Sequence, residues 1–258
     1  MLTLRLEGHR TAVLGAGGAI GRACVRQLAE LGGEVAAIDR DKTLAEGALN
    51  GVAGVHRAYE ADVADPDAVS ATVAAVWADG PVDGVIYAPG IAITSDVADM
   101  AWPDYRRLMA VNLDGAFHAA QAFVKPMIAV KRPGAFVFLS SMAGLRGEAG
   151  ASAYCASKFG LIGLTQSFAA ELTPHHIRVN AVCPGNVDSP LLRQVSEDIA
   201  AYRGGDADDV HAEAAKIGAA RRLVTADEVA SVCVWLVSPA ASAVTGTALP
   251  VDVGALVG

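Results

Sequence analysis

The sequence has few cysteines, and they are not arranged in pairs. Cys24, Cys155, Cys183 and Cys233 are scattered over 258 residues, without a Cys-x-x-Cys motif or a cluster of histidines. Such spacing argues against a disulfide framework and against a structural metal site. We therefore expect a protein that holds no metal ion.

Long apolar runs and excess basic charge are also lacking. No run approaches the ~18 residues of a membrane span, and Arg5 and Glu7 interrupt the apolar residues at the start, so we expect no signal peptide. The formal net charge is −8, whereas phosphate binding by a nucleic-acid partner needs a basic surface. We expect a cytoplasmic protein whose partners include neither nucleic acid nor a membrane.

Short apolar runs alternate with longer helix-like stretches, and 53% of the residues are apolar. This alternation predicts an α/β fold, a single-domain doubly wound (Rossmann-like) parallel sheet with helices on both faces, over 1–258. Strands are expected near 11–14, 34–38, 55–61, 82–87, 134–139, 177–182 and 247–252, and helices near 104–130, 153–172 and 227–236. The stretch 186–224 shows no clear pattern and is expected to be a long substrate loop, since long loops in compact domains are usually functional.

A glycine-rich turn, Gly15-Ala-Gly-Gly-Ala-Ile-Gly21, follows the first expected strand and opens the first helix. Backbone N–H groups and the helix dipole at such a turn can meet a phosphate. Asp39 ends the second strand, where a carboxylate accepts hydrogen bonds from the ribose of NAD and repels the 2′-phosphate of NADP. The neighbouring Arg40 could bind that phosphate through its positive charge. We predict NAD as the cofactor and keep NADP as the alternative.

Tyr154 and Lys158 are four residues apart, and Ser141 lies thirteen residues before Tyr154. On a helix, residues i and i+4 share a face. A free tyrosine titrates near pH ~10, and a neighbouring ammonium lowers that pKa because it favours the phenolate. We predict that Lys158 lowers the pKa of Tyr154, so that Tyr154 can exchange a proton with an alcohol or a ketone. The pair alone would also suit an ordinary helix surface.

Together these residues resemble the short-chain dehydrogenase/reductase family over essentially the whole chain. Further motifs of that family follow in order: Asp62-Val63, Asn112 in Val-Asn-Leu, Ser140-Ser-Met-Ala-Gly144 and Pro184-Gly185. The resemblance implies a catalytic tetrad of Asn112, Ser141, Tyr154 and Lys158, with spacing selecting Ser141 over Ser140. It implies cofactor contacts from Gly15, Gly18, Ala19, Ile20, Gly21, Asp39, Arg40, Asp62, Val63, Ala88, Gly90, Tyr154, Lys158, Pro184, Gly185, Val187 and Ser189.

Two departures from the family pattern concern the cofactor site. Ala19 replaces the middle glycine of the phosphate loop, and Tyr87-Ala-Pro-Gly90 replaces Asn-Asn-Ala-Gly after the fourth strand. Ala88 removes a side chain that braces the sheet in the family, and Pro89 removes a backbone donor. Neither departure touches the residue expected to transfer the proton.

The resemblance implies hydride transfer between NAD and a secondary alcohol or ketone, with Tyr154 as general acid/base. The alternatives are an NADPH-dependent carbonyl reductase and a catalytically weak nucleotide-binding regulatory protein. It also implies a homotetramer, with a homodimer as the alternative. The substrate stays open among a sugar, a hydroxy acid, a steroid-like ring and a polyketide intermediate. Specificity is expected from 186–224 and from walls near Ile91, Glu148 and Cys183, although the charges of Arg146 and Glu148 are themselves expected at the surface.

Overall fold

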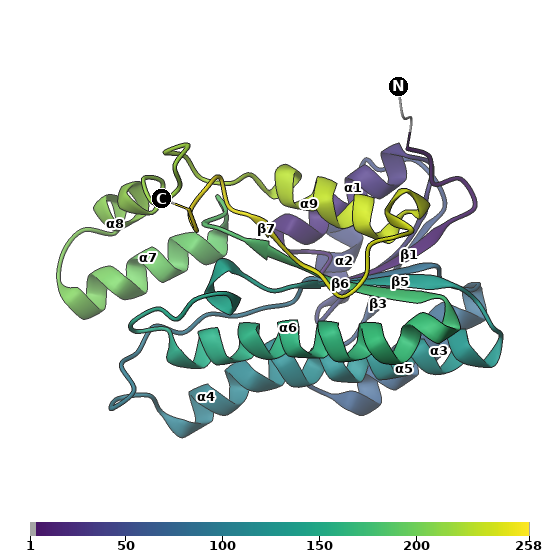
Figure 1. Ribbon diagram of the computed structural model, residues 1–258, viewed down its shortest axis with the longest axis horizontal. Coiled ribbons are helices and arrows are strands. Elements are labelled where there is room, and N and C mark those ends of the chain that lie inside the picture. Colours follow the sequence, from purple (N-terminus) through teal and green to yellow (C-terminus); the bar gives the residue numbers. More distant parts are fainter. Residues whose placement is uncertain (1–3, 258) are drawn as a thin grey trace.

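The computed structural model describes residues 4–257 as one parallel sheet with helices on both faces (Figure 1). The strands lie in the order β3-β2-β1-β4-β5-β6-β7. Their bounds are β1 (Arg10–Leu14), β2 (Glu34–Asp39), β3 (His56–Glu60), β4 (Gly84–Tyr87), β5 (Gly134–Leu139), β6 (Ile177–Pro184) and β7 (Ala248–Val251). The predicted fold class is confirmed, and the ends of the predicted strands shift by at most two residues.

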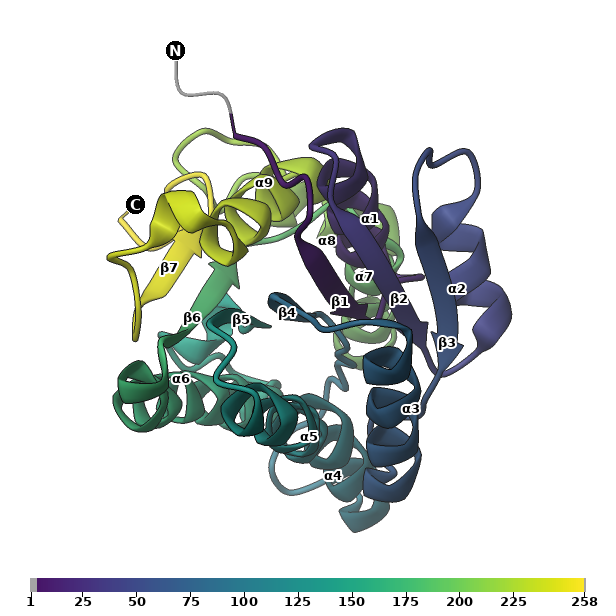
Figure 2. The same cartoon turned by 90° about the vertical axis from the view of Figure 1, so that its right-hand side faces the viewer.

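Helices cover the sheet in two layers (Figures 1 and 2). One layer holds α1 (Ala19–Glu30), α2 (Lys42–Leu49) and α9 (Ala226–Val237), and the other holds α3 (Pro66–Asp79), α4 (Trp102–Met109), α5 (Gly115–Ala129) and α6 (Ser152–Leu172). Val13 of β1 packs into the first layer, whereas its neighbours Ala12 and Leu14 pack into the second. Both faces of the strand are therefore buried, as expected for a parallel sheet.

The strand order reverses beside β1, which pairs with β2 on one side and with β4 on the other. In a doubly wound sheet, ligands bind outside the carboxyl ends of the strands at this switch point. The turn after β1 begins at Gly15, and the segment after β4 begins at Ala88. The fold therefore places the glycine-rich turn at the edge where a ligand crevice forms.

The expectation of an irregular loop over 186–224 is wrong. This stretch contains α7 (Pro190–Arg203) and α8 (Ala207–Ala214), which lie beyond one end of the sheet in Figure 1. Ser189 caps α7 by accepting from the Leu192 amide, and Asp206 caps α8 by accepting from the Asp208 amide. Such side chains at N-caps stabilise helix starts. Few residues of the two helices are buried, so the apolar periodicity is weak and the pattern is hard to see in sequence.

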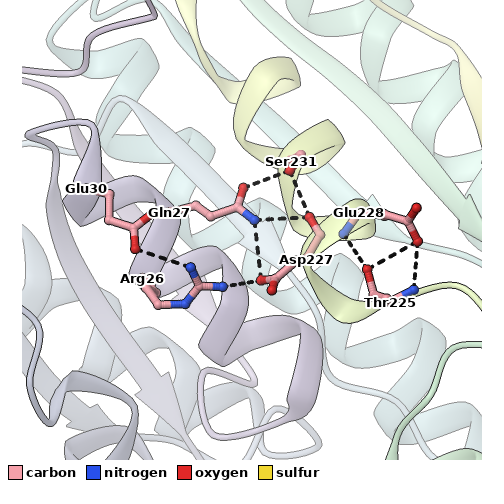
Figure 3. Close-up of polar contacts among 7 residues, drawn as sticks. All are labelled: Arg26, Gln27, Glu30, Thr225, Asp227, Glu228 and Ser231. Carbon is pink, nitrogen blue, oxygen red and sulfur yellow. Dashed lines mark hydrogen bonds and ion pairs between the residues drawn. The ribbon is translucent and has the colours of Figure 1, made fainter.

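A polar cluster joins α1 to the start of α9 (Figure 3). Arg26 pairs with Asp227, and the Gln27 side-chain amide donates to the Asp227 carbonyl at 3.0 Å. Thr225 and Glu228 form a capping box at the start of α9. Exposed ion pairs contribute little stability, so the buried apolar contacts between α1 and α9 hold the two helices together more than this cluster does.

The helix expected over 104–130 is interrupted by a π-helical turn, Ala110–Asp114, between α4 and α5. The Tyr87 hydroxyl, at the end of β4, donates to the Val111 carbonyl at 2.5 Å. A Cβ on Gly115 would lie 2.5 Å from the Tyr87 hydroxyl, so the helix can approach only because this residue is glycine. π-helical turns are frequent at functional sites, and this one carries Asn112. Short 3₁₀ turns complete the fold at Met142–Gly144, Thr173–His175 and Pro239–Ala241.

Candidate active site

Two adjoining cavities open at the carboxyl edge of the sheet and share Ala88 and Gly90 as walls. The larger, of about 480 Å³, is also lined by six other predicted cofactor residues: Gly15, Gly18, Asp39, Arg40, Asp62 and Val63. The smaller, of about 210 Å³, is also lined by Ile20, Ser141, Tyr154, Lys158, Pro184, Gly185, Val187 and Ser189. Three predicted site residues, Ala19, Gly21 and Asn112, line neither cavity.

The glycine turn forms a cradle that larger side chains would fill. Gly15 has a φ of +69°, and a Cβ there would lie 2.8 Å from the Pro89 nitrogen. A Cβ on Gly21 would lie 2.0 Å from the Gly15 carbonyl oxygen. Ala19 begins α1 behind the cap residue Gly18, and among residues 4–257 no side chain caps this helix. The first-turn amides are therefore available to an anion, as a dinucleotide pyrophosphate requires.

Asp39 links the end of β2 to this turn. One carboxylate oxygen accepts from the Gly17 amide at 2.9 Å, and the other accepts from the Arg40 amide at 2.9 Å. Asp39 is half-buried, whereas Arg40 is exposed. A carboxylate has about four lone-pair sites, so Asp39 keeps acceptor capacity toward the larger cavity.

Tyr154 and Lys158 lie one turn apart on α6, and the Lys158 Nζ is 5.6 Å from the centre of the Tyr154 ring. Lys158 is 3% exposed and donates to the Leu139 carbonyl at 2.8 Å. Ser141 follows β5 and accepts from the Ala143 amide at 3.1 Å. The structure therefore brings Ser141, Tyr154 and Lys158 together around the smaller cavity. The hydroxyl of Ser140 turns away and donates to the Lys158 carbonyl at 2.8 Å.

Burial shifts the titration of this pair against our expectation. It raises the pKa of Tyr154 to about 12, opposed by the neighbouring Ser141 hydroxyl. Burial also lowers the pKa of Lys158 to about 8. In the protein without ligands, burial therefore outweighs any lowering by Lys158, and the expected pKa of Tyr154 below that of free tyrosine is not found. The physical reason is that loss of water disfavours the charged forms of both groups, which residue spacing alone does not reveal.

Asn112 is fully buried and lines neither cavity. Its amide donates to the Ile91 carbonyl at 2.9 Å, and its oxygen accepts from the Ile91 amide at 2.9 Å. The amide also donates to the Ser157 hydroxyl at 3.1 Å. Asn112 thus holds the segment after β4 against α6, because its side-chain amide makes the pair of hydrogen bonds that a neighbouring backbone would otherwise make.

Glu148 faces the smaller cavity, although its charge was expected at the surface. Its Oε1 is buried without a hydrogen-bond partner, and the nearest guanidinium nitrogen, Nε of Arg146, is 3.6 Å away. Arg146 itself is exposed, as expected. A sequence signal for Glu148 exists, because the residue lies between Ser141 and Tyr154, which both reach the cavity. The orientation of a loop side chain, however, depends on tertiary packing.

Within residues 4–257, no group of three or more His, Cys, Asp or Glu side chains is arranged to hold a metal ion. In the same part of the chain, every helix is too short or too polar to cross a membrane. Three features lie along one crevice: a glycine turn with free amides, an acidic side chain at the end of β2, and a Ser–Tyr–Lys group at the far end. Together they define a dinucleotide-dependent oxidoreductase site.

Comparison with known proteins agrees with this class. A family model described as enoyl-(acyl carrier protein) reductase matches residues 15–255. Galactitol 2-dehydrogenase of Rhizobium johnstonii is 38% identical over 97% of this chain and 96% of that protein. D-threitol dehydrogenase of Mycolicibacterium smegmatis is 33% identical over 97% and 94%. The solved structure of carveol dehydrogenase from Mycobacterium avium in complex with NAD aligns with a TM-score of 0.92 at 26% identity, over 99% of this chain and 100% of that chain.

The chain belongs to the short-chain dehydrogenase/reductase family of nicotinamide-dependent oxidoreductases. The family predicted from the sequence motifs is therefore confirmed.

The buried Lys158 ammonium destabilises the protein without ligands at neutral pH. A pKa lowered from 10.5 to about 8 corresponds to about 3 kcal/mol, and losing the donor to the Leu139 carbonyl costs about 1 kcal/mol. We therefore expect Lys158→Met to stabilise the cofactor-free protein at pH 7 by about 2 kcal/mol. Urea unfolding of both proteins at matched concentration measures the difference.

The pH dependence of this gain follows from the sign of the shift. Between pH 8 and 10 the unfolded chain binds the Lys158 proton and the folded chain releases it, so wild-type stability rises with pH relative to the variant. The gain should therefore shrink at pH 9.5. A Lys158→Met protein that is less stable than wild type at pH 7, or a gain equal at both pH values, would contradict the assignment.

Proposed function

We propose that this protein is an NAD-preferring dehydrogenase that interconverts a secondary alcohol and its ketone, with Tyr154 as general acid/base. The observation that carries the proposal is the meeting of Ser141, Tyr154 and Lys158 around one cavity that adjoins the dinucleotide crevice. Two relatives are named for galactitol and D-threitol oxidation, which supports an alcohol with several hydroxyl groups as the substrate.

In the oxidation direction, Tyr154 takes the hydroxyl proton of the substrate as hydride leaves the carbinol carbon. Ser141 donates to the substrate oxygen and stabilises the charge that develops there. A bound oxidised nicotinamide supplies the hydride acceptor and a positive charge that favours the phenolate. Lys158 stabilises the phenolate in its ammonium form and binds the nicotinamide ribose. Reduction follows the same path in reverse.

The proposal also includes a proton path that leads from Tyr154 to solvent. Lys158 lies beside Tyr154, and a Cβ on Gly90 would lie 3.4 Å from the Lys158 Nζ and 3.7 Å from the Asn112 oxygen. That oxygen accepts from the Ile91 amide and retains a second lone pair. An ordered water between Lys158 and Asn112 would complete the path.

Tyr154→Phe should lower kcat for alcohol oxidation by about 10²–10⁴-fold, the usual contribution of a general base, while NADH binding changes little. Steady-state rates and NADH fluorescence titration measure the two effects. Tyr105→Phe is the matched control, because this side chain stacks on Trp102 in α4 and lies outside the cavity. Wild-type rates in Tyr154→Phe would remove Tyr154 from the proposed role.

Asp39 should set the preference for NAD over NADP. Asp39→Asn keeps an acceptor for the Gly17 amide but removes the charge that repels the 2′-phosphate, so we expect the NAD/NADP ratio of kcat/KM to fall by about tenfold. Arg40→Ala is the reciprocal variant and should lower NADP-dependent rates more than NAD-dependent rates. A wild-type preference for NADPH that Arg40→Ala abolishes would establish the carbonyl-reductase alternative instead.

The assembly we propose is a homotetramer formed through the outer faces of α5 and α6. Phe117 and Phe159, one on each helix, are 42% and 46% exposed, and apolar side chains gathered on a helix pair indicate an interface. Light scattering after size exclusion should give four times the 26.3 kDa chain mass, and Phe117→Glu with Phe159→Glu should give a smaller species. A monomeric wild type contradicts this assembly, and a dimer supports the alternative.

A further inference from the structure

Glu148 offers a hydrogen-bond acceptor to the cavity that holds the proposed catalytic group. Its side chain is 34% exposed, and its two oxygens differ in their surroundings. Oε1 is buried and receives no hydrogen bond within residues 4–257. Oε2 is the oxygen that a ligand in the cavity can reach, and a carboxylate oxygen accepts hydrogen bonds from hydroxyl groups.

The neighbouring cation does not satisfy this oxygen. Arg146 holds its Nε 3.6 Å from Oε1, beyond hydrogen-bond range. One terminal nitrogen of Arg146 donates to the Ala255 carbonyl at 3.3 Å, and the other faces the Met142 sulfur at 4.0 Å. Arg146 thus lies against Oε1 and balances part of the charge of Glu148, but it donates no hydrogen bond to the carboxylate.

The carboxylate of Glu148 differs in charge and polarity from most of the other side chains that line the cavity. Glu148 and Lys158 are the charged side chains among the described residues that line the cavity, and Lys158 already donates to the Leu139 carbonyl. Much of the remaining wall is aliphatic or thioether: Ile93, Met142, Leu191, Leu192 and Val195. Glu148 therefore offers a directional contact beside the proton-transfer group.

Glu148 also lies close to the reacting end of the cavity. Its backbone carbonyl accepts from the Ala151 amide at 3.2 Å, in the loop that leads directly into α6 and Tyr154. The negative charge of Glu148 contributes to the raised pKa of Tyr154. Glu148 and Tyr154 also line one cavity of about 210 Å³, so a small alcohol bound there lies beside both side chains.

We propose that Glu148 determines substrate specificity by accepting a hydrogen bond from a hydroxyl on the carbon next to the reacting carbon, so that vicinal diols and α-hydroxyketones are the preferred substrates. This assignment rests on the proposed dehydrogenase function. The chemistry that an unpaired carboxylate recognises is a hydrogen-bond donor, either a hydroxyl or an ammonium. The partial balance of its charge by Arg146 favours the neutral hydroxyl.

Matched pairs of alcohols test the assignment: 2,3-butanediol with 2-butanol, trans-1,2-cyclohexanediol with cyclohexanol, and 1-phenyl-1,2-ethanediol with 1-phenylethanol, all stereoisomers included. The readout is the diol/mono-ol ratio of kcat/KM. Because a hydrogen bond to a charged group contributes roughly 10- to 100-fold, we expect wild type to favour the diol at least tenfold. Glu148→Leu should reduce the ratio to within about threefold of unity, and Glu148→Gln, which keeps an acceptor, should retain an intermediate ratio.

The controls separate specificity from folding. Glu171→Leu changes an exposed glutamate near the end of α6 and should keep the wild-type ratio. Thermal unfolding and NADH titration of every variant show that the fold and the cofactor site persist. The assignment is overturned if wild type prefers the diol in none of the pairs, if Glu148→Leu keeps the wild-type ratio, or if wild type prefers 3-amino-2-butanol to 2,3-butanediol.

Failure of the broader proposal has a different signature. If wild type oxidises no alcohol of the panel with NAD or NADP, the dehydrogenase function itself fails, and the role of Glu148 fails with it. Oxidation of diols and mono-ols at equal rates overturns only the role of Glu148.

Discussion

The ends of β1 and β4 approach so closely that the backbone after β1 leaves no space for a side chain. A Cβ at Gly15 would lie 2.8 Å from the Pro89 nitrogen, and the φ of +69° at this residue is one that glycine adopts without strain. This close approach sets the floor of the crevice at the switch point of the sheet. Ala88 and Gly90 line both cavities. The close approach of the two strand ends therefore sets the position of the proton-transfer group relative to a bound dinucleotide.

Two contacts hold this floor where the family asparagine is absent. The Tyr87 hydroxyl reaches the Val111 carbonyl, and the Asn112 amide pairs with both backbone groups of Ile91. These contacts attach the end of β4 and the segment after it to one π-helical turn. Because a buried polar group left unpaired costs about 1–3 kcal/mol, each contact restrains the local geometry. The replacement of asparagine by Ala88 is thus accompanied by bracing from neighbouring side chains.

The sequence predicted the sheet well because buried parallel strands are short apolar runs, and Asp39 at the end of β2 follows from that register. Most residues named from the ordered family motifs line the two cavities, whereas Ala19, Gly21 and Asn112 line neither. The sequence did not reveal α7 and α8, whose starts depend on the caps Ser189 and Asp206 more than on apolar periodicity. It left open whether Glu148 faces the pocket or the surface, and it missed the effect of burial on Tyr154, since both depend on packing between distant segments.

Burial raises the pKa of Tyr154, so a base effective near neutral pH needs further stabilisation of the phenolate. A pKa of about 12 lies some four units above that of a base effective near pH 8, which corresponds to roughly 5 kcal/mol. Lys158, whose own pKa is lowered to about 8, is only partly charged at that pH. Ser141 lowers the pKa of Tyr154 and Glu148 raises it, so the protein groups partly cancel. In the proposed mechanism, the Lys158 ammonium and the cation of a bound cofactor would supply the remaining stabilisation of the phenolate, which would couple proton transfer to an occupied dinucleotide site.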